Sequence, residues 1–74
     1  MQETRRTQKD FKFARQLKRL RRKANVTQEQ LADATRLSTT FIGLLETAKR
    51  KPSLKTLQKI ASALGVKANE LIPF

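Results

Sequence analysis

The chain has 74 residues, with 17 Lys and Arg against 6 Asp and Glu, and a formal net charge of +11. This length allows one small domain near the lower limit for a self-standing hydrophobic core. Cysteine and histidine are both absent, which excludes disulfides and nearly excludes metal sites and His-dependent catalysis. A strongly positive chain repels itself unless a polyanion is near, which favours nucleic acid as the partner and leaves an anionic membrane surface as the rival.

Several other functions are disfavoured by the sequence. It has no paired-carboxylate constellation and no Gly-rich phosphate loop, so we expect no enzyme activity, no cofactor and no small-molecule ligand. No stretch approaches the roughly 18 apolar residues of a spanning helix, and no signal-peptide core follows Met1. Apolar residues make up 38% of the chain and recur periodically from Phe13 onward. We therefore expect a folded cytoplasmic protein.

The first ten residues, MQETRRTQKD, are polar and lack periodicity. They predict a flexible basic N-terminal arm over 1–10, or a frayed helix start, with Asp10 as a possible cap for the following helix. Residues 11–74 are then the folded domain. A first helix is expected over 11–24, with a buried face made of Phe13, Leu17, Leu20 and Ala24.

Much of the remaining surface of this first helix is cationic. Residues 1–25 carry +8 of the net charge, counting ten Lys and Arg against Glu3 and Asp10. A solvated helix face explains most charge runs, but this excess has one sign and favours phosphate contact. The cations of the helix are Lys12, Arg15, Lys18, Arg19, Arg22 and Lys23.

Two short helices joined by a turn are predicted over about 28–46. Asn25 ends the preceding helix in a left-handed conformation. Thr27 and Gln30 match a capping box for the first helix of the pair. The turn is 35–37, and Ser38 caps the second helix, 39–46. The residues expected to face inward are Leu31, Ala32, Thr35, Leu37, Ile42 and Leu45.

The outward face of helix 39–46 carries small, uncharged side chains. Thr39, Thr40, Gly43, Leu44 and Thr47 point outward. A threonine can meet base edges through its hydroxyl and thymine through its methyl group, and Gly43 adds no bulk. Base contact is therefore predicted for Thr39, Thr40 and Leu44, with Gly43 at the same surface. The alternative is that the threonines only fill the first helical turn and that Leu44 is core.

The rest of the chain continues the helical pattern. The basic loop 47–53 ends at Pro52 and Ser53, which stop one helix and cap the next. That next helix has an apolar stripe and ends at Gly65, and a last helical turn is expected around 69–72. The sequence thus predicts one all-α domain of about five helices. The stripe consists of Leu54, Leu57, Ile60, Ala61 and Leu64.

Residues 17–72 resemble the helix-turn-helix domain of the phage lambda/434 repressor and Cro type, the XRE family. The matching string is LRRKANVTQEQLADATRLSTTFIGLLETAKRKPSLKTLQKIASALGV. The resemblance implies a compact five-helix lambda-repressor-like domain that binds operator DNA in the major groove, usually as a dimer on a two-fold site. It implies that Gln28 lies beside a phosphate. It also suggests that Glu46 pairs with Arg21, which turns toward the DNA backbone.

This chain departs from the family pattern at two places. The family usually has Gly where Arg36 stands, so Arg36 must accept a positive φ or the turn must differ locally. Ala48 and Lys49 occupy a loop that often holds Gly. The predicted phosphate-contacting residues are Gln28, Ser38, Arg21, Arg36, Lys49, Arg50 and Lys51.

A homodimer is expected because one such helix reads only a few base pairs, and two copies must lie about 34 Å apart to meet successive major grooves. Ile72 and Phe74 are the predicted dimer interface, with Leu71 expected in the core. Two other readings of the chain stay open. It could be a protein-interaction module of the same fold, such as a bridging coactivator or an antitoxin-like partner. A basic amphipathic membrane peptide over 11–24 fits the capped helices and apolar stripes poorly.

Overall fold

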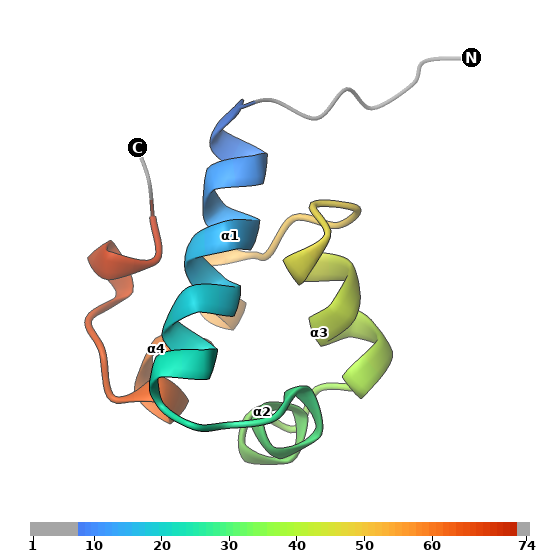
Figure 1. The fold of residues 1–74 in the computed structure, drawn as a ribbon, viewed down its shortest axis with the longest axis vertical. Helices are drawn as coiled ribbons and strands as arrows, with labels where there is room; N and C mark the ends of the chain where they lie inside the picture. The colour runs from blue at the N-terminus through green and yellow to red at the C-terminus, as the bar shows by residue number, and fades with distance from the viewer. Residues whose placement is uncertain (1–7, 73–74) are drawn as a thin grey trace.

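The computed structural model describes residues 8–72 and contains four α-helices and one short 3-10 helix, with no strand in that range. In Figure 1, α1 stands along the long axis, α3 lies on one side of it and α2 crosses below. The 3-10 helix η1 returns beside α1, where Gln16 Nε2 donates to the Glu70 carbonyl at 2.9 Å. The elements are α1 (Gln8–Lys23), α2 (Gln28–Thr35), α3 (Thr39–Glu46), α4 (Leu54–Leu64) and η1 (Ala68–Glu70).

Two predictions about the helices are wrong. The expected fifth helix is only the single 3-10 turn η1, so the domain has four α-helices rather than five. The first helix begins at Gln8, three residues before the predicted start, which places Asp10 inside its first turn rather than at the cap. Residues 1–7 of the predicted arm lie outside the described residues. The all-α prediction is confirmed for residues 8–72.

One hydrophobic core joins all four α-helices and the segment after η1. Its fully buried large side chains are Leu17, Leu31, Ile42, Leu45, Ile60 and Leu71. Two residues predicted in apolar faces are instead exposed. Ala24 follows the last residue of α1, so the helical face does not extend to it. Leu54 is the first residue of α4 and is 63% exposed, because the helix reaches the core only from its second turn.

All four α-helices end in the same way. Each is followed by a residue with positive φ, at 58° for Asn25, 59° for Arg36, 62° for Ala48 and 70° for Gly65. The next amide then donates to a carbonyl five residues earlier, at 2.9–3.1 Å. This is the Schellman motif, in which left-handed geometry satisfies the last carbonyls of a helix. The predicted left-handed end at Asn25 is confirmed, and Arg36 does accept the positive φ.

The residue after the left-handed position differs in one of the four cases. Val26, Leu37 and Val66 are partly buried and pack against the core. At the end of α3 the same position holds Lys49, which is exposed. Three helix ends are thus anchored by an apolar contact, as is usual for this motif, and the fourth presents a cation to solvent.

Replacing Arg36 with glycine is expected to stabilise the domain by about 0.5–1 kcal/mol. A left-handed conformation costs an L-residue roughly 1–2 kcal/mol, and glycine removes this cost while losing part of the gain to unfolded-state entropy. The exposed Arg36 side chain has no hydrogen bond or ion pair with residues 8–72 to lose. Urea denaturation measures the change. Arg36→Ala, which keeps the unfavourable φ, should not show the gain.

Candidate nucleic-acid interface

Hydrogen-bonded N-caps on α2 and α3 help to fix the orientation of α3. The Thr27 hydroxyl accepts from the Gln30 amide at 3.0 Å, and Gln30 Oε1 accepts from the Thr27 amide at 2.9 Å, which confirms the predicted capping box. The Ser38 hydroxyl accepts from the Phe41 amide at 3.0 Å. Behind these caps, Ile42 and Leu45 are completely buried. The opposite side of α3 is therefore held toward solvent.

A buried ion pair ties the end of α3 to α1. Arg21 Nε lies 2.5 Å from Glu46 Oε2, and Arg21 Nη2 donates to Glu46 Oε1 at 3.1 Å. Arg21 Nη1 donates to the Val26 carbonyl at 2.8 Å. The hydrogen bond to Glu46 raises the pKa of Arg21 above its ordinary value, with burial opposing the shift and the Glu46 charge adding to it. The Arg21–Glu46 pairing suggested by the family resemblance is confirmed.

The start of α2 joins the same network. Gln28 Nε2 donates to Glu46 Oε1 at 3.0 Å, so a single carboxylate connects α1, α2 and α3. Arg21 is only 9% exposed and is engaged through all three of its nitrogens. The network gives Arg21 and Gln28 a positioning role that the sequence did not suggest for Gln28. Their phosphate contacts stay predictions.

The outward face of α3 has the composition expected from the sequence. Thr39 and Thr40 are exposed, and Gly43 and Leu44 are half-buried. A Cβ added at Gly43 would meet nothing within 4 Å, so the space above this position is open. Leu44 is half-buried and is not among the residues of the hydrophobic core, and its base contact stays a prediction.

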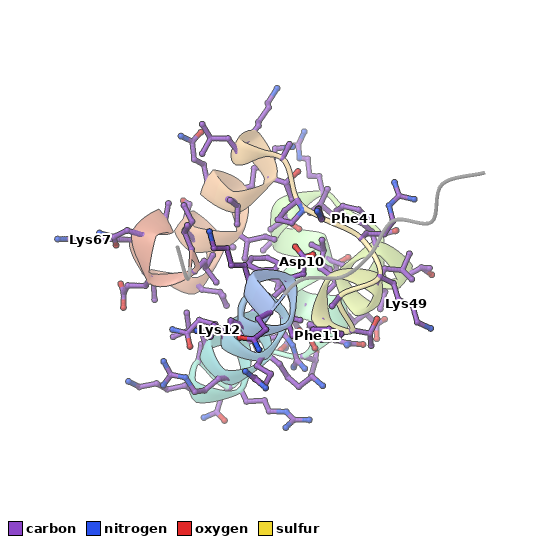
Figure 2. All side chains as sticks on the ribbon, turned by 90° about the horizontal axis from the view of Figure 1, so that it is seen from above. Asp10, Phe11, Lys12, Phe41, Lys49 and Lys67 are labelled. Atoms are coloured by element: carbon purple, nitrogen blue, oxygen red, sulfur yellow. The ribbon has the colours of Figure 1, made fainter. Side chains whose placement is uncertain are left out.

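Cations from the loop after α3 flank this face. Lys49 and Arg50 are exposed, and the Arg50 guanidinium lies 6.0 Å from the centre of the Phe41 ring, within cation–π range. Lys51 Nζ lies 3.7 Å from Asp10 Oδ2 on α1. Figure 2 shows Lys49 beyond α3, at the edge of the molecule. The contacts of Phe41 and Asp10 were missed, because the first needs the loop to fold back on α3 and the second needs the loop to reach α1, which is far away in the chain.

Two predicted phosphate-contacting residues, Arg36 and Ser38, lie before α3 in the chain. Arg36 shares a shallow surface depression with Lys55 and Lys59 of α4, so the structure does not group it with the loop cations. Ser38 lies at the start of α3 as predicted.

At the chain's end, Leu71 is fully buried, as expected. Ile72 is partly buried against the core, and Phe74 lies outside the described residues. Neither result tests the predicted dimer interface.

Across residues 8–72 no group of three or more acidic side chains could hold a metal ion. No helix in that range is long and apolar enough to cross a membrane.

The fold and this surface define a helix-turn-helix DNA-binding domain. The family model described as "HTH_3: Helix-turn-helix" matches residues 17–71. The chain therefore belongs to the HTH_3 helix-turn-helix family, the XRE type, and is a DNA-binding transcriptional regulator.

Three similar proteins support this assignment. The control protein C.MunI of Mycoplasma is 38% identical over 62 residues, covering 82% of this chain and 84% of that protein. The immunity repressor protein of Bacillus phage phi105 is 34% identical over 56 residues, or 76% of this chain, which spans only 39% of that repressor. The crystal structure of the restriction-modification controller protein C.AhdI from Aeromonas hydrophila superimposes with a TM-score of 0.81 at 34% identity, covering 84% of this chain and 94% of that one. These three names all describe regulatory proteins.

Proposed function

We propose that this regulator is a repressor that reads the major groove with α3, as a homodimer on a two-fold operator in the cytoplasm. The observation that carries the proposal is the outward face of α3. It combines exposed Thr39 and Thr40 with open space above Gly43, and exposed Lys49 and Arg50 lie next to it. In helix-turn-helix proteins the second helix presents its N-terminal residues to the base edges. Such a surface fits a groove whose walls are phosphates.

The proposed base-reading set is modest. Thr39, Thr40 and Leu44 offer hydroxyl and apolar contacts, which discriminate less sharply than a bidentate Arg–guanine or Gln–adenine pair. Phosphate contacts therefore supply most of the affinity. In this scheme Phe41 holds the Arg50 guanidinium beside the reading helix, and the Arg21–Glu46–Gln28 network sets the angle at which α3 meets the groove.

Selection of bound sequences from a random duplex pool tests the proposal. An inverted repeat should be enriched, with half-sites about 34 Å, or one helical turn, between centres. Absence of any enriched sequence would leave a nonspecific binder, and enrichment of an unrepeated site would contradict the dimer. The second function that the fold permits is a protein-interaction module. Such a module would not retard random DNA in a gel-shift experiment, whether at low or at high salt concentration.

Thr40→Ala is expected to change the preferred base at one or two positions of the site. The substitution removes a hydroxyl and a methyl group from the proposed base contact but leaves every phosphate contact in place. Binding to random duplex should therefore persist. Repeating the selection with the variant measures the effect, and Ser62→Ala, an exposed hydroxyl on α4, serves as the matched control. An unchanged selected site would remove Thr40 from the reading surface.

Lys49→Ala is expected to weaken binding to all sequences alike. Lys49 follows the end of α3 and is exposed, whereas the residues at the same position after the other three helices pack against the core. The Lys49 side chain is therefore available for contact with a phosphate. Loss of one phosphate contact per protomer should lower the salt slope by about 1 for each protomer bound. Titrations with the selected site and with random duplex measure it. A loss confined to the selected site would instead make Lys49 a base contact.

A further inference from the structure

The outer side of α1 carries four cations, Lys12, Arg15, Arg19 and Arg22, here called the α1 stripe. Their spacings of three, four and three residues place them on one side of a helix, and all four are exposed. None of them forms an ion pair with another residue of the range 8–72. The only side-chain bond in the stripe runs from Arg19 Nε to Gln16 Oε1, at 3.1 Å. The α1 stripe therefore presents unneutralised charge.

The α1 stripe runs from the flank of α1 to the side opposite α3. Arg21 marks the side of α1 that meets α3, since it bonds Glu46. At about 100° per residue, Lys12 and Arg19 lie roughly 160–180° around the helix from Arg21, and Arg15 and Arg22 lie roughly 100–120° from it. Figure 2 agrees, with Lys12 projecting from α1 on the side away from α3 and Lys49 lying beyond α3. A straight duplex seated on α3 is therefore expected to leave at least Lys12 and Arg19 uncovered.

The surface at the stripe is concave and suited to a chain of phosphates. Lys12, Arg15 and Arg19 line a shallow depression of about 540 Å³, which borders Ile72 of the predicted dimer interface. Gln16 at its edge is bonded to the Glu70 carbonyl. Glu70, the one acid lining it, accepts the Lys67 amide at 2.9 Å. The four cations are separated along the helix axis by about 4.5–6 Å. A DNA strand offers a phosphate about every 3.4 Å of its axis, so each cation has a partner within reach.

We propose that the α1 stripe is a second DNA-binding surface, which holds the backbone of another duplex while α3 occupies the first. One protomer then bridges two DNA segments. This second contact needs no base sequence and so goes beyond the proposed operator reading. A membrane is a poorer partner, because insertion needs an apolar face and the apolar face of α1, with Phe13, Leu17 and Leu20, is buried in the core. Phe11 is the one large apolar side chain of α1 that is exposed.

A capture assay with matched charge variants tests the bridge. One duplex carrying the selected site is fixed to beads, a second labelled random duplex is free, and captured label is measured. The stripe variant Lys12→Gln, Arg15→Gln, Arg19→Gln is compared with Lys55→Gln, Lys59→Gln, Lys67→Gln. Both variants lower the net charge from +11 by three, and all six positions are exposed, so the loss of charge is matched and its position differs. Circular dichroism and binding of each variant to a single short site verify fold and operator reading.

The expected result is capture by the unaltered chain, capture reduced at least tenfold in the stripe variant, and capture largely kept in the control variant. Equal losses in both variants would mean that net charge alone acts, and would overturn the proposal. Full capture by the stripe variant would mean that the two α3 helices of a dimer each hold one duplex, and this result would also overturn the proposal. If the unaltered chain captures no label, the proposal is also overturned. Binding of the chain to vesicles containing phosphatidylserine in that case would point to a membrane as the partner of the stripe. If sequence selection fails, random duplex on the beads replaces the selected site, so that the bridge is still tested and only the proposal of operator reading is overturned.

Discussion

Replacing Glu46 with alanine is expected to destabilise the domain by about 3–5 kcal/mol, because it leaves the Arg21 charge buried without its partner. Glu46 is 4% exposed and accepts hydrogen bonds from both Arg21 and Gln28, so solvent cannot replace the lost carboxylate. A domain of this size has a total stability of about 4–11 kcal/mol, and the variant should be close to unfolding at room temperature. Urea denaturation followed by circular dichroism measures the loss.

Two further variants separate the causes of this loss. Glu29→Ala removes an exposed carboxylate from the first turn of α2 and should cost no more than about 1 kcal/mol. The double variant Arg21→Met, Glu46→Leu removes both charges and should recover much of the stability, since apolar replacement of a whole buried pair is often neutral. A double variant no better than Glu46→Ala would mean that the hydrogen bonds to Val26 and Gln28 dominate.

The ion pair also predicts how stability responds to pH. The folded-state pKa of Arg21 is raised, so its contribution is complete below the ordinary arginine pKa and is lost only as pH rises through the still higher folded value. Arg21 titration therefore adds no pH dependence near neutrality, and its loss would appear only in strongly alkaline solution.

Gly43→Glu is expected to lower DNA affinity by about 100-fold or more while leaving the fold at least as stable. A Cβ added at this position meets nothing within 4 Å, and replacing glycine inside a helix gains about 0.5–1 kcal/mol. On the proposed reading face, however, the new carboxylate enters a groove lined by phosphates, where opposed like charges cost several kcal/mol. Denaturation and gel-shift titration of the same preparation measure both effects.

The control for this variant is Gly43→Ala, which should share the gain in stability and lose far less affinity. On a surface that does not contact DNA, neither substitution would lower the affinity for DNA by more than a small factor. If Gly43→Glu bound as tightly as the unaltered chain, α3 would not lie in the groove, whatever the rest of the molecule did.

Local chemistry explains which parts of the fold could be predicted from the sequence. The Thr27–Gln30 capping box, the Ser38 and Ser53 caps and the left-handed end at Asn25 depend on residues within a few positions of one another, and all are present. Helix boundaries depend on where packing stops. Periodicity alone therefore extended the buried faces too far, to Ala24 and Leu54, and missed the early start of α1 at Gln8.

The functional surface divides in a similar way. Helical spacing was enough to place Thr39, Thr40 and Gly43 outward. The contacts that position the surface join residues far apart in the chain, such as Gln28 with Glu46 and Phe41 with Arg50. No single helix carries a pattern for these contacts, and the Arg21–Glu46 pair was expected only from the family resemblance. The separation of the α1 stripe from α3 likewise required the packing of two helices to be known.

The most direct test of the account is a salt titration of DNA binding, carried out with the selected site and with random duplex of equal length. If about six phosphates are neutralised per dimer, log K should fall by about five for each tenfold rise in salt. The selected site should stay above random duplex throughout, because base contacts by α3 do not release counterions. A nearly flat salt dependence, or two curves that coincide at every salt concentration, would contradict DNA reading by α3 with affinity supplied by phosphates.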